Sequence, residues 1–144
     1  LKGNGSGGFS SAAAGTDYLA PAAIGTTVQA YDAQLFSNIP QNSQSAAYTL
    51  VASDAQKHIY HPSADTTARI WTIPANSSVA YPVGTAITFI NDTSAGVITI
   101  AITSDTLVLA GAGTTGSRTL AASGIATAIK KTSTSWMISG TGLT

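Results

Sequence analysis

The chain has 144 residues, of which only 8% are charged, against about 25% in an ordinary soluble domain. Its six acidic residues are all Asp, and six Lys and Arg residues bring the formal net charge to zero, so the chain lacks the basic field that nucleic-acid binding requires. Cysteine is absent, which excludes disulfides, thiolate zinc sites and cysteine nucleophiles.

Hydropathy along the chain argues against membrane insertion. No run approaches the roughly 18 apolar residues of a spanning helix, and the start lacks the basic flank and apolar core of a signal peptide. Because the sequence begins at Leu1 in the middle of a motif, we expect a fragment of a longer polypeptide. A near-neutral surface with few charges favours self-association, so we expect part of it to be buried against copies of the chain.

Residues 1–45 predict an extended segment and a linker rather than a domain. Residues 3–8 contain only Gly, Asn and Ser and cannot contribute to a core. Residues 27–36 are the best helical candidate, because apolar side chains recur there at i, i+3 and i+7. At about two turns, such a helix would be marginal without tertiary contacts. Residues 40–43 are typical of a linker.

From residue 48 onward, short runs rich in Thr, Val and Ile alternate with turn residues, which is typical of β-strands. The clearest alternation places Ile98, Ile100 and Ile102 on one face and Thr99 and Thr103 on the other. The predicted strands are residues 48–52, 57–61, 68–73, 86–91, 96–103, 106–110, 117–122, 124–131 and 135–139.

Regularly spaced strands without intervening helices predict an all-β head domain over residues 46–144. We expect antiparallel meanders or Greek keys that form a sandwich or small barrel of about eight to nine strands. The polar sequence at residues 92–95 predicts a tight turn between two of these strands. Three prolines fall between the runs and support their boundaries.

Several segments are similar to stretches that recur in bacteriophage tail fibres. They are LKGNGSGGFS and AAAGTDYLAP at residues 1–10 and 12–21, and GTTVQAYDAQL at residues 25–35. The remainder resembles a C-terminal module of phage structural proteins through YTL, WTIPAN, GTAITF and WMISG, which begin at residues 48, 71, 84 and 136. The resemblance spans nearly the whole chain.

The resemblance implies an elongated, homotrimeric virion protein, assembled in the host cytoplasm, whose distal end contacts the bacterial surface. Its partners would be two identical chains and a host receptor, which we expect to be a surface polysaccharide. The isolated apolar residues Phe9, Tyr18 and Leu19 favour the trimer as well, because they need a partner chain to be buried. The resemblance supplies no set of binding residues.

The only cluster of residue types that commonly bind metals lies around two histidines. His58 and His61 have Asp54 and Asp65 nearby in sequence, but positions three apart in a strand point to opposite faces and would not converge on one ion. A turn at this segment would let them converge. We favour ordinary surface or interface histidines and expect no metal or other cofactor.

Carboxylates offer a candidate for polysaccharide cleavage, which needs a pair of acidic groups. Asp54, Asp65, Asp92 and Asp105 are available, but most of them fall in predicted turns, where Asp is expected for backbone hydrogen bonding. A long parallel β-helix, which would present a substrate groove, does not fit into the head domain. The Gly-rich residues 111–116 lack a following helix and a phosphate-binding Lys, and so predict a hairpin connection rather than a nucleotide site. We therefore expect no catalytic residues.

Aromatic side chains are the best candidates for binding a saccharide, because flat apolar faces suit sugar rings. The candidate site residues are Tyr60, His61, Arg69, Trp71, Tyr81 and Trp136. Arg69 shares strand parity with Trp71 and would lie on its face. The competing interpretation, which we favour for both Trp residues, is that they fill the core.

Three functions remain open on the sequence alone. The chain is expected to be a trimeric, non-catalytic attachment module at a fibre tip, where three copies multiply a weak contact. An architectural module that connects or caps the fibre needs the same fold, so the sequence does not separate the two. A polysaccharide-degrading tip is the third and the least favoured.

Overall fold

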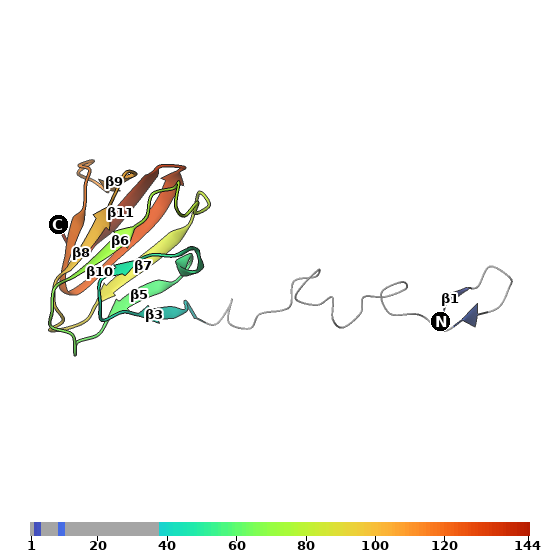
Figure 1. Cartoon of the computed structure of the whole chain (residues 1–144), viewed down its shortest axis with the longest axis horizontal. Coiled ribbons are helices and arrows are strands. Elements are labelled where there is room, and N and C mark those ends of the chain that lie inside the picture. The colour runs from blue at the N-terminus through green and yellow to red at the C-terminus, as the bar shows by residue number, and fades with distance from the viewer. Residues whose placement is uncertain (1, 4–8, 11–37) are drawn as a thin grey trace. The chain divides into compact units, whose positions relative to one another are not determined.

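The computed structural model describes residues 2–3, 9–10 and 38–144, and the chain divides into two units, residues 1–37 and 38–144 (Figure 1). In the first unit, β1 (Lys2–Gly3) pairs with β2 (Phe9–Ser10) in an antiparallel ladder. The helix expected at residues 27–36 lies outside the described residues, as do residues 1, 4–8 and 11–37 of the predicted shaft segment.

The second unit is built around a single sheet of nine strands, which confirms the all-β prediction. A 3₁₀ turn, η3 (Ala52–Asp54), is the one helical element of residues 38–144. The strands are β3 (Gln41–Ser43), β4 (Tyr48–Thr49), β5 (His58–His61), β6 (Arg69–Ile73), β7 (Ala86–Asn91), β8 (Ile98–Ile102), β9 (Thr106–Leu109), β10 (Arg118–Thr132) and β11 (Ser135–Leu143). Within the described residues, no helix is long and apolar enough to cross a membrane.

The order of the strands differs from the expected antiparallel meander. The hydrogen-bonded path is β3-β5-β7-β10-β8-β6-β4, so that β3, β5 and β7 precede β10 in the order and β4, β6 and β8 follow it. β7 and β8 pair with different stretches of β10. β3, β5 and β7 are parallel to one another, as are β4, β6 and β8. The fully antiparallel prediction is therefore wrong. Alternation of apolar residues specifies which face is buried but says nothing about the direction of the neighbouring strand.

β3 and β4, β5 and β6, and β7 and β8 are each joined by an arch, that is, a connection between strands that face each other instead of pairing. We number these three arches in chain order. The polar residues 92–95 were expected to form a tight turn between neighbouring strands, but β7 and β8 share no ladder. The arches stack: the amide of Asp92 in the third donates to the carbonyl of His61 at the start of the second (3.0 Å). We call residues 44–47, 62–68 and 92–97 the arch rim.

The longest strand, β10, joins the two halves of the sheet. Residues 118–120 pair with β8 and residues 124–129 pair with β7, all antiparallel. A register shift between Leu120 and Ile125 bends the strand, as bulges do, and curls the open sheet into a half-barrel (Figure 1). The two strands predicted at residues 117–122 and 124–131 are thus one.

The far side of β10 carries the last hairpin of the chain. β11 pairs with it in an antiparallel ladder, and β9 adds to β11 in parallel. The Gly-rich residues 111–116 fold back on β9 through an antiparallel bridge between Val108 and Thr115. The chain therefore turns back at these residues as predicted, but β9 pairs with β11 and not with β10.

The core fills the inside of the curled sheet with alternate side chains of nearly every strand. Ile98 and Ile100 are fully buried and Ile102 is half-buried, which confirms the alternation expected there. Burial of one such side chain contributes about 1.5–3 kcal/mol. The fully buried large side chains include Leu50, Ile59, Trp71, Ile73, Ile87, Phe89, Leu107, Leu120, Trp136 and Ile138.

Gly96 lets two arches approach each other. Its amide donates to the carbonyl of Asp65 (3.0 Å), and a Cβ atom at this position would overlap the backbone carbonyl of Thr67. A larger residue would push the second and third arches apart, so close approach of the backbone explains the glycine.

The domain begins earlier than the sequence indicated. Residues 40–43 were expected to be a linker, but Gln41–Ser43 form β3 and pair with β5. The compact unit starts at Asn38, so the predicted boundary at residues 45 and 46 lies inside the first arch. Polar residues without an apolar alternation concealed this strand, because its register is set by β5.

Candidate functional site

Four of the six residues expected to bind a saccharide are buried. Trp71, Trp136 and His61 have no exposed surface, and Tyr81 is 4% exposed. A sugar ring cannot stack on a side chain without exposed surface, so these four are corrected to core residues. The core interpretation of both Trp residues is confirmed.

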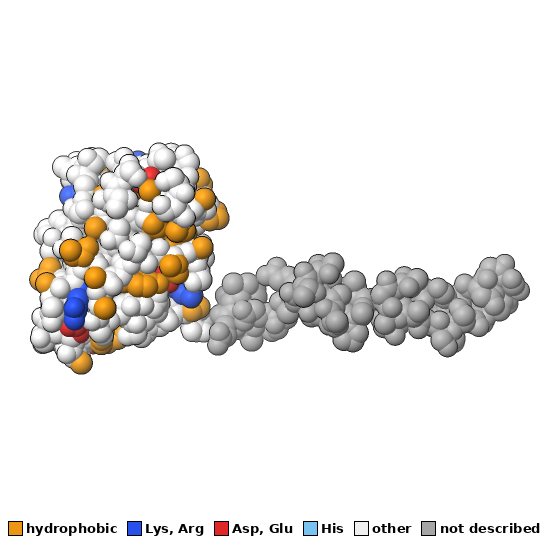
Figure 2. Space-filling model, viewed as in Figure 1, with side chains coloured by type: hydrophobic (Ala, Val, Ile, Leu, Met, Phe, Trp, Pro, Cys, Tyr) orange, Lys and Arg blue, Asp and Glu red, His pale blue; other side chains and the backbone are white. Residues whose placement is uncertain are grey.

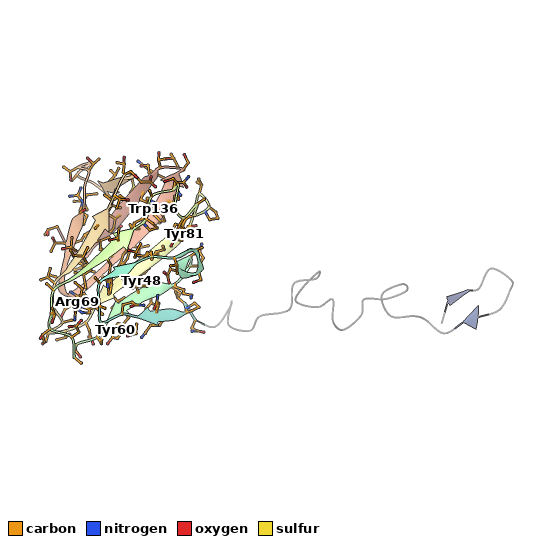
Figure 3. All side chains as sticks on the ribbon, viewed as in Figure 1. Tyr48, Tyr60, Arg69, Tyr81 and Trp136 are labelled. Atoms are coloured by element: carbon orange, nitrogen blue, oxygen red, sulfur yellow. The ribbon has the colours of Figure 1, made fainter. Side chains whose placement is uncertain are left out.

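The buried aromatics pack against one another in two groups toward the two ends of the sheet. Figure 3 labels Tyr81 and Trp136 of one group. Trp71 lies between the rings of His61 and Phe89, at centroid distances of 5.8 and 6.2 Å. Near the opposite end, Tyr81 and Trp136 meet edge to face at 5.5 Å. The edge-to-face contacts of His61 with Trp71 and of Tyr81 with Trp136 stabilise the core beyond the area they bury.

Arg69 lies at the arch rim and belongs to a network that reaches into the core. Its guanidinium donates to both carboxylate oxygens of Asp65, at 2.7 and 3.1 Å. Asp65 also lies 3.0 Å from Nε2 of His61, whose Nδ1 lies 2.9 Å from Oδ1 of Asn91. Asn91 in turn donates to the carbonyls of Gly96 (3.0 Å) and Leu120 (3.1 Å). The chain of contacts ties the second arch to the third and to β10.

The two histidines do not converge. His58 is half-buried on the outer face of β5 and lies 3.0 Å from Oε1 of Gln41, whereas His61 points into the core. Residues 38–144 contain no group of three or more side chains that could hold a metal ion. As predicted, His58 and His61 point to opposite faces of the strand.

Tyr60 is the second predicted residue at the arch rim. Its hydroxyl donates to Oδ2 of Asp92 at 2.5 Å. This hydrogen bond raises the pKa of Tyr60 and lowers the pKa of Asp92. Asp92 also accepts from the backbone amide of Thr93 (2.7 Å), so its carboxylate fixes the shape of the third arch.

Asp54 is a buried carboxylate at the opposite side of the sheet from β10. It accepts from Asn42 (2.8 Å), the hydroxyl of Tyr48 (2.8 Å) and the amide of Val51 (2.9 Å). Burial and the hydrogen bond to Asp54 raise the pKa of Tyr48. Asp54 thus caps η3 and holds β3 and β4 together.

Acid is expected to loosen the arch rim. The Arg69 guanidinium, followed by His61, holds the pKa of Asp65 well below its ordinary value of 3.8. A carboxyl whose folded-state pKa is lowered stabilises the protein above its unfolded pKa and loses that contribution as the pH falls. We expect the melting temperature to drop as the pH falls below about 4.

The Asp65→Asn variant separates the contribution of Asp65 to acid-dependent stability from the contributions of the other carboxylates. It is expected to melt lower than the wild type at neutral pH and to show a shallower fall in melting temperature below about pH 4. Melting curves followed by circular dichroism measure both. A wild-type acid slope retained in full by the variant would contradict the assignment.

The structure brings together a polar pocket that sequence reasoning missed. It has a volume of about 320 Å³ and lies between the end of β8, the start of β9 and the residues that precede β10. Asp105 lines it together with Ile102, Thr103, Thr106, Leu107 and Ser117. The sequence placed Asp105 among the carboxylates available for polysaccharide cleavage but did not indicate a pocket around it. The Thr and Ser residues on both sides of β9 were the signal that could have located the pocket.

The outer face of β10 and β11 carries exposed apolar side chains. Ile125 and Ile129 are each 48% exposed and Met137 is 40% exposed. Met137 pairs with Ile129 across the ladder, and Thr127 lies between the two isoleucines. We call Ile125, Thr127, Ile129 and Met137 the outer strip. Few charged side chains interrupt the hydrophobic ones on the face of this unit that Figure 2 shows.

Comparisons with known proteins return no match. No protein-family model, no curated protein and no solved structure matches the chain.

Proposed function

We propose that the chain is the C-terminal attachment module of a bacteriophage tail fibre, a virion protein that binds a polysaccharide on the host surface without cleaving it. Three identical chains would form the functional unit. The proposal starts from the resemblance of residues 1–35 and 46–144 to fibre segments. It is supported by a compact all-β unit whose arches hold loops in defined positions, as attachment proteins require.

The outer strip is the observation that carries the trimeric part of the proposal. Three large apolar side chains lie side by side on a regular face of the sheet and are roughly half exposed. Exposed apolar patches of this kind mark protein interaction sites. None of the four residues of the strip is charged, so a second copy would present a surface of the same chemistry without burying an unpaired charge.

The environment of the carboxylates supports binding without catalysis. Asp54, Asp65 and Asp92 each accept two or more hydrogen bonds from neighbouring groups that shape the fold. Glycoside cleavage by a carboxylate pair needs one protonated acid and one free base. The lowered pKa values of Asp65 and Asp92 disfavour the protonated form of both.

Adsorption of the whole chain to bacteria tests the attachment function. Fluorescently labelled protein is expected to bind cells of the host and to be displaced by polysaccharide extracted from their surface. The polysaccharide should keep its length on prolonged incubation, as size-exclusion chromatography would report. Shortening would favour a degrading tip. A trimer that binds no host cells would favour the architectural alternative instead.

The oligomeric state is expected to depend on the outer strip. Light scattering coupled to size exclusion should give a mass of about three times 14.4 kDa for the wild type. Ile129→Lys places a charge in the strip and should shift the mass toward the monomer, because burying an unpaired ammonium is strongly unfavourable. Val83→Lys, at a position 64% exposed outside the strip, is the control and should leave the trimer intact. A wild-type mass near 14.4 kDa would contradict the trimer.

A further inference from the structure

The pocket beside β9 has the lining of a site for a neutral, hydroxyl-rich ligand. Of the residues that line it, Asp105 is the only charged one, and the others carry hydroxyl, apolar or glycine side chains. A second anion in this space would be repelled by the carboxylate. A positively charged side chain, which would bind a phosphate or a carboxylate ligand, is absent from the lining.

Asp105 is held in place by one of its two oxygens. Its Oδ2 accepts from the backbone amide of Asn76 (3.0 Å). The side chain of Asn76 is itself bound, because Lys130 donates to its Oδ1 at 2.6 Å. Asn76 and Lys130 thus orient the carboxylate, while Oδ1 is left to accept from a ligand. A preorganised carboxylate is a strong acceptor for hydroxyl groups.

The rest of the lining complements this acceptor. Ser117 accepts from the amide of Ile102 (3.2 Å), so its own proton remains available for donation. The pocket also carries the hydroxyls of Thr103 and Thr106, which both donate and accept. Ile102, which is half-buried, adds apolar surface against which the C–H face of a ring can pack. A sugar ring combines hydroxyl edges with such a face.

We propose that this pocket binds a single sugar unit of the host surface polysaccharide, with Asp105 accepting hydrogen bonds from its hydroxyl groups. The inference deepens the attachment function and rests on it. The volume of about 320 Å³ is at the lower end of the range for small-molecule sites, which fits one sugar ring rather than a longer segment. Three such pockets in a trimer would supply the avidity that a weak single contact lacks.

Amide chemical shifts of the whole chain locate the binding. The isotope-labelled protein is titrated with methyl glycosides of glucose, galactose, mannose, rhamnose and N-acetylglucosamine. At least one is expected to shift the amides of residues 102–107 and 115–117 in a saturable way. Asp105→Asn keeps an acceptor for the Asn76 amide and should weaken that binding about tenfold or more, because a charge-assisted hydrogen bond is lost.

Asp92→Asn is the matched control, since it removes the same charge at the arch rim and should leave the affinity unchanged. The sugar site would be ruled out if Asp105→Asn and the wild type bound the glycoside with equal affinity. It would also be ruled out if the amide shifts were confined to the arch rim, or if no glycoside shifted any amide. These results leave the attachment function standing if the wild-type chain still adsorbs to host cells. If the wild-type chain does not adsorb to host cells, both the attachment function and the sugar site would be ruled out.

Discussion

Trp71→Ala is expected to lower the free energy of unfolding by about 3–5 kcal/mol, the usual cost of truncating a buried Trp. The side chain is fully buried, contacts the rings of His61 and Phe89, and donates from Nε1 to the carbonyl of Ala46 (3.2 Å). Truncation would leave a cavity between the two halves of the curled sheet and an unpaired carbonyl in the first arch. Because domains of this size are stable by about 5–15 kcal/mol, the loss is a large part of the total.

Ile70→Ala is the matched control for this prediction. Ile70 is the preceding residue on the same strand but points outward and is 53% exposed. Its truncation should change the free energy of unfolding by less than about 1 kcal/mol. Urea titrations at a fixed protomer concentration measure both, since self-association would otherwise shift the midpoint. Similar values for the two variants would contradict the assignment of Trp71 to the core.

Asn91→Ala, at the end of β7 beside the arch rim, is expected to lower the free energy of unfolding by about 2–5 kcal/mol. The side chain is 1% exposed, donates to two backbone carbonyls and contacts Nδ1 of His61. Its removal takes a hydrogen-bond partner from each of these three groups. The loss should appear as a lower urea midpoint and as faster amide exchange in residues 92–97, which are held by these bonds.

Thr93→Ala, two positions along the same arch, separates the buried network from general sensitivity of the loop. Thr93 is exposed, and its hydroxyl contacts only that of Ser123 (3.2 Å). We expect its effect to stay within about 1 kcal/mol. An Asn91→Ala protein as stable as Thr93→Ala would mean that the network contributes little to the stacking of the arches.

Strand positions were predictable because apolar alternation reports directly on burial. The strand at residues 86–91 was predicted with the bounds observed for β7, and those at 57–61, 68–73 and 106–110 agree with β5, β6 and β9 to within a residue at each end. The bend in β10 was not predicted, because Ser123 and Gly124 resemble a turn between two strands. A bulge and a turn use the same residue types, and only the partner strands distinguish them.

The candidate binding residues were predicted less well than the strands. Tyr60 and Arg69 lie at the arch rim as strand ends should, but each is already bound to an Asp of its own or the next arch. In the sequence, a Trp such as Trp71 or Trp136 looks the same whether it fills a core or binds a sugar. Their depth depends on which strands face them across the sheet, and that is a property of the assembled arches.

What the sequence by itself determined is the all-β class, the place of most strands and the face that each buries, because these follow from local alternation and turn residues. Strand order and direction were decided by the tertiary structure, since the arches place consecutive strands across the core, where hydrogen bonds to β10 and between arches select their neighbours. The pocket at Asp105 and the outer strip arise in the same way. The pocket joins residues of β8 and β9 with the loop that precedes β10, and the outer strip joins β10 with β11, so only the assembled sheet brings these residues together.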